Sequence, residues 1–306
     1  MALSSGRNRG RALARLTTAA IAAALVGTTA GTAMADDNPG PVPAPFKGVQ
    51  QAAPKAAAAS KYAPVLGVYG VTKAGDIYGY HPDKRGGLEG GKVDTGFWKD
   101  RVHTIFQVDH DKDRLLDGMY GRYTNGTLAF MHVDKGEKKL GGGWNQYNLL
   151  MSPGNLAGTK QSDILARNKS GVLYLYLAKA DGSLQTKKRI GGGWDQYTQI
   201  AGQHDLTGDG KADIVARDKA GVLWLYKGTG DANKPFAKRA KVGGGWGGYN
   251  RLLSSGDVDL DGRTDLIARD KAGNAWLFKG TGKASAPFKA KKKVASGWGK
   301  FTLIFS

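Results

Sequence analysis

Short runs of apolar residues, joined by turns that contain glycine, recur along the chain from Tyr62 onward. In DIVARDKAGVLWLYKG (213–228), aliphatic and aromatic residues flank a Lys-Ala-Gly turn, and glycine accepts the positive φ that a tight hairpin turn requires. Equivalent turns surround five glycines: Gly75, Gly126, Gly171, Gly221 and Gly273. The pattern therefore predicts five repeated units, each with a β-hairpin.

The fifth unit contains four expected strands, A to D, at 249–258, 264–270, 274–280 and 290–297. Four short antiparallel strands in about 40 to 50 residues match the size of one propeller blade. The repeats begin at 65–70, which aligns with strand B, and end at 300–306, which aligns with strand A. Pairing these segments would complete a blade and remove two exposed sheet edges. We predict an all-β fold, a five-bladed β-propeller with four-stranded blades, closed by the C-terminal strand joining the N-terminal blade. A solenoid is the alternative.

A tryptophan element accompanies the hairpins at intervals of roughly 50 residues, with Trp98, Trp144, Trp194, Trp246 and Trp298 as its members. Three members lie in GGGW-x-x-Y segments, which pair Trp144 with Tyr147, Trp194 with Tyr197 and Trp246 with Tyr249. Such rings beside glycine-rich loops are candidate ligand-binding residues, because aromatic faces stack on sugar rings. The alternative is packing between neighbouring blades, since ring assembly itself requires a residue in every unit.

The composition supports many short strands, because glycine is abundant (47), proline is modest (10) and aromatic residues are frequent. The formal net charge of +19 favours anionic surroundings. The alternative is that these lysines form a solvated outer face and protect the edge strands from pairing with other chains. We expect an extracellular glycan, an anionic cell-wall polymer or a protein as the partner of a monomeric chain, and no nucleic acid.

Residues 1–35 have the features of a secretory signal peptide: a basic start, an apolar run from Leu16 to Val26, and the cleavage-site pattern Ala33-Met34-Ala35. The run is too short for a stable membrane span, and an uncleaved anchor is the alternative. The Pro- and Ala-rich segment 36–60 is interpreted as a linker, which leaves 61–306 as the propeller. We expect a secreted protein, extracellular or associated with the cell wall. It has no cysteine, so its stability must come from a core, a closed ring or a metal.

Acidic residues recur between strands A and B with the spacing D-x-[D/T]-x-D-G-x-x-D. Oxygen ligands at alternate positions, a glycine at the bend and a closing carboxylate suit calcium, Ca²⁺. The fourth unit offers Asp205, Thr207, Asp209 and Asp213, and the fifth offers Asp257, Asp259, Asp261 and Asp265. The backbone carbonyl of Lys211 or Arg263, at the seventh position, is expected to add a ligand.

The other units depart from this spacing. The second has Asp109, Asp111, Asp113 and Asp117, but Arg114 occupies the place of the glycine, so weaker binding is expected. The third, with Asn155 at its first position, has lost most charged ligands, and the first has no such loop. An EF-hand is disfavoured, since no Glu occupies the twelfth position. The alternative to calcium is a set of Asp-Gly turns whose side chains bond only to nearby amides.

The units GDVDLDGRTDLIARDKAGNAWLFKGTG and HDLTGDGKADIVARDKAGVLWLYKGTG resemble the FG-GAP or VCBS repeats of secreted bacterial proteins and, more distantly, the integrin α-chain propeller. The resemblance covers about 62–306 and is strongest in the last three units. It implies a propeller with calcium in the A–B loops, with ligand roles for the residues named in the fourth and fifth units.

Catalysis would require an acid, a base or a nucleophile converging in one pocket, and the sequence indicates none. The five histidines, His81, His103, His110, His132 and His204, share no repeat position and form no HExxH spacing. We expect no enzyme but a non-catalytic binding module for extracellular or cell-wall glycans. A protein-interaction scaffold and an unrecognised hydrolase or lyase are the alternatives.

Overall fold

The computed structural model describes residues 63–94 and 101–306. The predicted signal peptide (1–35), the predicted linker (36–60) and Trp98 lie outside the described residues. No helix in the described ranges is long and apolar enough to cross a membrane.

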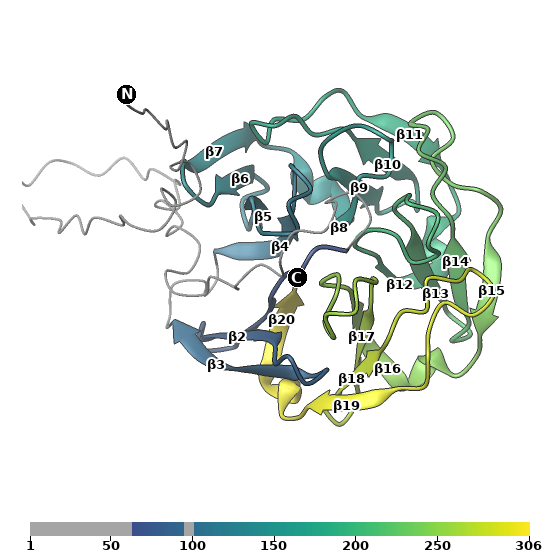
Figure 1. Cartoon of the computed structure of the whole chain (residues 1–306). Helices are drawn as coiled ribbons and strands as arrows, with labels where there is room; N and C mark the ends of the chain where they lie inside the picture. The colour runs from purple at the N-terminus through teal and green to yellow at the C-terminus, as the bar shows by residue number, and fades with distance from the viewer. Residues whose placement is uncertain (1–62, 95–100) are drawn as a thin grey trace, which may run out of the picture. The chain divides into compact units, whose positions relative to one another are not determined.

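The described chain forms five antiparallel sheets of four strands each, which confirms the predicted all-β propeller (Figure 1). The strands of blades 1 to 3 are β1 (Val68–Thr72), β2 (Ile77–Pro82), β3 (Leu88–Asp94), β4 (Val102–Val108), β5 (Gly118–Tyr123), β6 (Leu128–His132), β7 (Gly136–Gly141), β8 (Tyr147–Gly154), β9 (Asp163–Asn168), β10 (Leu173–Tyr176) and β11 (Lys188–Gly191). Blades 4 and 5 comprise β12 (Tyr197–Ala201), β13 (Ile214–Asp218), β14 (Leu223–Tyr226), β15 (Ala240–Gly243), β16 (Tyr249–Leu253), β17 (Leu266–Asp270), β18 (Ala275–Phe278) and β19 (Lys292–Ala295), and β20 (Phe301–Phe305) completes blade 1.

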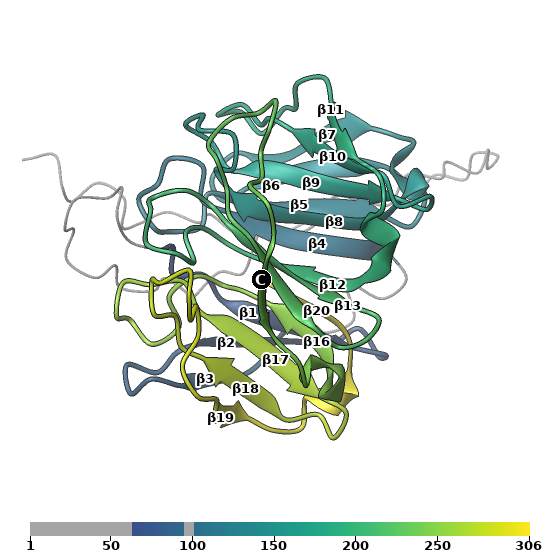
Figure 2. The ribbon, with the colours of Figure 1, turned by 90° about the vertical axis from the view of Figure 1, so that its right-hand side faces the viewer.

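The strands of blade 5 are shorter than the sequence predicted. Strand A ends at Leu253 rather than at 258, because the following residues leave the sheet and begin the loop to β17. Figure 2 shows β16 to β19 side by side in chain order, with β19 at the edge. The innermost strands of the ring are therefore the A strands, and the outermost are the D strands.

The ring closes where the sequence predicted. The C-terminal strand β20 pairs with β1, with Tyr69 opposite Phe305 and Gly70 opposite Ile304. A Cβ at Gly70 would lie 2.5 Å from the ring of Phe301, so glycine allows the two strands to approach. Both ends of the repetitive region are thus held in one sheet, and every inner strand in the described part of the chain is paired.

A hydrophobic cluster lies between each pair of neighbouring blades. Four short 3₁₀ helices contribute to these clusters: η1 (Trp144–Gln146), η2 (Trp194–Gln196), η3 (Trp246–Gly248) and η4 (Trp298–Lys300). The backbone N–H of each first tryptophan donates to the hairpin-turn glycine of the preceding blade, as Trp144 does to Gly126 O at 3.0 Å. The D–A connections therefore join each blade to the previous one.

A repeated arginine strengthens the same junctions. Arg122 on β5 donates from Nη1 to the carbonyls of Trp144 (3.0 Å) and Tyr147 (2.5 Å) of the next blade. Arg167, Arg217 and Arg269 make the equivalent pair of bonds in the following three junctions. One guanidinium thus satisfies two carbonyls at the start of each following blade.

Candidate metal centres

The acidic loops lie on one side of the ring, each between strands A and B of a blade. They comprise 109–117 after β4, 155–163 after β8, 205–213 after β12 and 257–265 after β16. Blade 1 has no such loop for a topological reason: its strand A is the end of the chain, and its strand B is the start of the repeats. The four loops are named below by their blades, 2 to 5.

In the loops of blades 2, 4 and 5, the first carboxylate organises the turn that follows it. Asp205 accepts the N–H groups of Thr207 and Gly208 at Oδ1 (2.8 and 2.7 Å) and that of Gly210 at Oδ2 (2.6 Å). Asp257 accepts N–H groups four and five residues ahead in the same way. These side chains therefore bond to nearby amides, as the alternative of simple Asp-Gly turns predicts. The carboxylate oxygens still have lone pairs with which they can bind a cation.

The ninth carboxylate ties the loop to its own blade. Asp265 is fully buried, with Oδ2 accepting the N–H of Val258 (2.9 Å) and Oδ1 accepting that of Gly280 (2.7 Å), which follows β18. Asp213 makes the same two bonds in blade 4. Asp163 holds two amides of the third-blade loop at 2.9 Å. This structural role explains why a carboxylate persists in a loop that has lost its other charges.

Three loops gather carboxylates closely enough to share a metal ion. One oxygen of each member lies within 4.8 Å of the others in three clusters: Asp109, Asp111 and Asp117; Asp205, Asp209 and Asp213; and Asp257, Asp259 and Asp265. Asp113 and Asp261 lie outside these clusters. Asp261 instead pairs with Arg263 at 3.0 Å. The structure thus brings together three of the four predicted carboxylates in the loops of blades 2 and 5.

The donors present fit a calcium ion. All are hard oxygens, and the hydroxyl of Thr207 is buried beside the Asp213 carboxylate without a hydrogen bond of normal geometry. Burial raises the pKa of Asp213 and of Asp265 to about 7 and that of Asp257 to about 6. Burial disfavours the anionic form of these carboxylates, and a divalent cation would favour it.

Side chains of the protein already place positive charge at the two most complete clusters. Lys227, directly after β14, lies 3.0 Å from Asp209 Oδ2, and Lys279, directly after β18, lies 2.7 Å from Asp259 Oδ2. Sequence reasoning did not identify either lysine. The signal was present in the segments LYKGTG and LFKGTG, which belong only to the two units with the best loops.

Arg114 makes contacts between blades that its place in the loop sequence did not indicate. Its φ is 77°, a left-handed value that suits the expected glycine. Its guanidinium extends across the gap left by the missing first-blade loop, where Nε donates to Ala63 O (2.8 Å) and Nη2 pairs with buried Asp257 (2.9 Å). The backbone of Ala63 and Pro64 bonds to the fifth-blade loop as well. This contact joins blade 2 to blade 5.

Replacing Arg114 with methionine should destabilise the calcium-free protein by about 2–4 kcal/mol, because Asp257 loses the partner of its buried charge. Saturating calcium should reduce this loss, since the ion would offset the same carboxylate. Urea unfolding with chelator and with calcium would measure both values. An equal loss of stability in the two conditions would mean that the contact between Arg114 and Asp257 is independent of calcium binding at the fifth-blade cluster.

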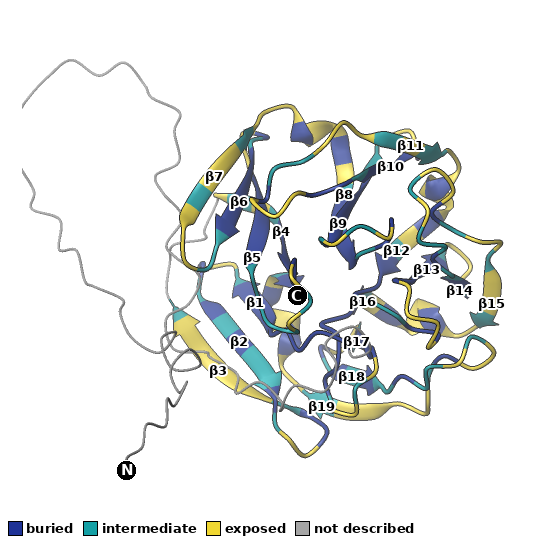
Figure 3. Cartoon of the chain, turned by 45° about the horizontal axis from the view of Figure 1, so that its top comes forward, coloured by how far each residue is buried: buried dark blue, intermediate teal, exposed yellow. Residues whose placement is uncertain are grey.

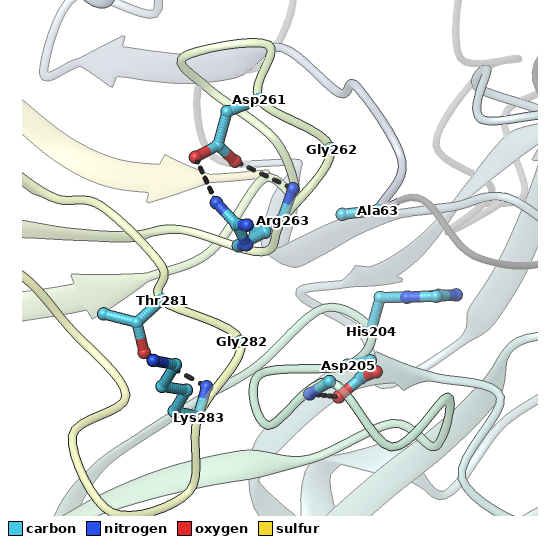
Figure 4. Close-up of a pocket in the computed structure, with 10 residues that line it drawn as sticks. Ala63, His204, Asp205, Asp261, Gly262, Arg263, Thr281, Gly282 and Lys283 are labelled. Atoms are coloured by element: carbon cyan, nitrogen blue, oxygen red, sulfur yellow. Dashed lines mark hydrogen bonds and ion pairs between the residues drawn. The ribbon is translucent and has the colours of Figure 1, made fainter.

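A cavity of about 400 Å³ lies between the loops of blades 4 and 5 (Figure 4). His204 and Asp205 line it from one side, Asp261 and Arg263 from another, and the 281–283 turn closes it. A Cβ at Gly208 would lie 2.4 Å from Gly282 O, so glycine lets the fourth-blade loop rest against that turn. The recess therefore borders the fourth-blade cluster through Asp205 and the fifth-blade loop through the Asp261–Arg263 pair.

The predicted aromatic ligand residues lie in the junctions between blades. The indoles of Trp144, Trp194 and Trp246 are 7–8% exposed, and their ring centroids lie 4.6–4.9 Å from rings on the C strands. Tyr147, Tyr197 and Tyr249 are 2–9% exposed. Rings covered to this extent pack in the core, and their faces are not available for stacking on a sugar in this conformation.

Comparison with known families matches one part of the chain. The FG-GAP-like repeat family matches residues 205–268, which contain the loops of blades 4 and 5. A search of curated proteins finds no match.

The solved structures that are similar to this chain share little sequence with it. Human WBSCR16 is 11% identical with a TM-score of 0.35, covering 76% of this chain and 66% of its own. The BP39L lectin from Burkholderia pseudomallei is 11% identical with a TM-score of 0.43, covering 75% and 68%. A mutant of AofleA from Arthrobotrys oligospora is 10% identical with a TM-score of 0.43, covering 77% and 73%.

The five four-stranded blades show the fold, and the family match over 205–268 agrees with the resemblance seen in the sequence. The chain is a five-bladed β-propeller that carries an FG-GAP-like repeat.

Proposed function

We propose that this protein is a secreted, calcium-binding propeller that acts as a non-catalytic binding module for extracellular or cell-wall glycans. The observation that carries the calcium part is the recurrence of carboxylate clusters in the A–B loops of three blades. Asp205, Asp209 and Asp213, assisted by the Thr207 hydroxyl, would hold one ion. The other two clusters would hold further ions, and the second-blade cluster would bind more weakly because it has Arg114 at the bend.

Calcium in this role is structural. The first carboxylate holds the turn and the ninth holds the following strands, so a bound ion would connect two segments that the backbone amides have already positioned. The chain's own residues orient the loops, and the ion would neutralise carboxylates that burial disfavours as anions. The module would then present rigid loops around the recess between blades 4 and 5.

Adding calcium to chelator-treated protein should raise its melting temperature. A ligand at 100 times its dissociation constant stabilises the folded state by about 2.7 kcal/mol per site, or about 5–10 °C for a domain of this size. Asp209→Ala combined with Asp259→Ala should remove most of the rise. Differential scanning calorimetry would measure both melting temperatures.

The matched control is Asp134→Ala combined with Asp231→Ala, which makes the same change of charge at exposed carboxylates outside the loops. It should keep the full response to calcium. If the wild-type protein shows no shift and elemental analysis finds no metal, the loops are turns only and the calcium part of the proposal fails.

A further inference from the structure

The outer strands of blades 3 to 5, together with the residues just before them, carry a strongly basic surface, here called the basic belt. It consists of Lys187, Lys188, Arg189, Lys238, Arg239, Lys241, Lys289, Lys291, Lys292 and Lys293. Segments 182–194, 232–250 and 271–306, which contain the belt, have no Asp or Glu. Figure 3 shows β15 and β19 at the circumference of the ring and largely exposed.

One cation in each of these blades lies over an aromatic ring on strand C. Lys187 Nζ lies 4.8 Å from the ring centroid of Tyr174, and Lys291 Nζ lies 4.4 Å from that of Trp276. In blade 4 the guanidinium of Arg239 lies 4.2 Å from the ring of Trp224. All three rings are partly exposed. The same arrangement therefore repeats in three successive blades.

A tyrosine hydroxyl fixes each of these cations from a second side. Lys187 Nζ donates to Tyr147 OH at 3.2 Å, and Lys291 Nζ donates to Tyr249 OH at 3.0 Å. Arg239 donates to Tyr197 OH. A side chain held between a ring and a hydroxyl loses little further freedom when it meets a ligand. Lysines that only discourage pairing of an edge strand need no such support.

We propose that the basic belt binds an anionic polysaccharide, with Lys187, Arg239 and Lys291 as its fixed contacts. This inference rests on the proposed binding function, but it does not depend on the calcium sites, which lie at the A–B loops. Repetition at one contact per blade suits a polymer, because each further contact becomes intramolecular once the first has formed.

The curvature of the belt favours a polysaccharide over duplex DNA. The three cations lie on successive blades of a closed ring, so a polymer that contacts all three must follow its circumference (Figure 3). Duplex DNA has a persistence length of about 50 nm and bends at considerable cost over so short a distance. A flexible carboxylated glycan follows the same path readily.

The test uses the full secreted chain, polygalacturonate as the anionic probe and dextran as the neutral one. Wild-type protein should bind polygalacturonate at low salt, in calcium or in chelator, and should release it as salt increases. It should not bind dextran. The triple variant Lys187→Gln, Arg239→Gln and Lys291→Gln should lose affinity on the order of tenfold.

The matched control is Lys84→Gln, Lys135→Gln and Lys160→Gln, which makes the same change of charge at exposed lysines outside the belt. It should retain affinity to within about twofold. Melting curves of both variants would show that they fold, and Lys187→Gln alone provides a milder second variant. Equal losses in the two triple variants, or equal affinity for duplex DNA, would overturn the proposal. Binding that persists without calcium would leave it standing even if the calcium titration fails.

Discussion

Ending the chain at Lys300 should abolish cooperative unfolding of the ring. The truncation removes β20, and with it Phe301, Ile304 and Phe305, which are 2–4% exposed. Truncating one buried residue of this kind to alanine costs about 2–5 kcal/mol. The loss of three such residues is comparable with the whole stability of a domain, about 5–15 kcal/mol. Urea unfolding followed by tryptophan fluorescence should show a broad, early transition, and gel filtration should show an expanded or aggregated chain.

The same strand offers a conservative control. Thr302 is exposed apart from its hydroxyl, which donates to Val71 O at 3.1 Å, and Thr302→Ser keeps that bond. This variant should unfold within about 0.5 kcal/mol of the wild type. If the truncated chain instead unfolded cooperatively with nearly wild-type stability, pairing of β20 with β1 would not be what closes the ring.

The number of blades and the closure could be predicted because both depend on local periodicity. Each hairpin turn marks its own unit, and the offset between the first and last segments follows from counting strands. The acidic loops could be located for the same reason, since all their ligands lie within nine residues. Features that depend on the residues of one unit, or on the order of the units along the chain, could thus be predicted from the sequence.

Contacts between distant units could not be predicted in this way. Arg114 and Asp257 are 143 residues apart and meet only because the first blade lacks a loop. The sequence therefore indicated only that Arg114, in place of the glycine, would weaken metal binding in the second-blade loop. The sequence pattern showed that a tryptophan recurs in each unit. It did not show which face of the indole ring a neighbouring blade covers.

The repeated arginine was visible in the sequence, yet its function was not. Arg122, Arg167, Arg217 and Arg269 occupy one position in four units, on the strand that precedes the hairpin turn. Their acceptors are backbone carbonyls, which every residue has, so no complementary side-chain pattern indicates the contact. Only the folded ring brings the carbonyls of the next blade within reach of the guanidinium.

Arg122→Met should be among the most destabilising single substitutions in the ring. The Arg122 side chain is 3% exposed, and its removal leaves the carbonyls of Trp144 and Tyr147 without this donor. Each buried polar group that loses its partner costs about 1–3 kcal/mol, so we expect a loss of about 2–5 kcal/mol in the free energy of unfolding from urea denaturation. Arg189→Met removes an exposed guanidinium from the adjacent blade and should cost less than about 0.5 kcal/mol. A similar cost for both variants would mean that apolar packing alone holds blades 2 and 3 together, whereas the expected difference would assign much of that junction to one buried guanidinium.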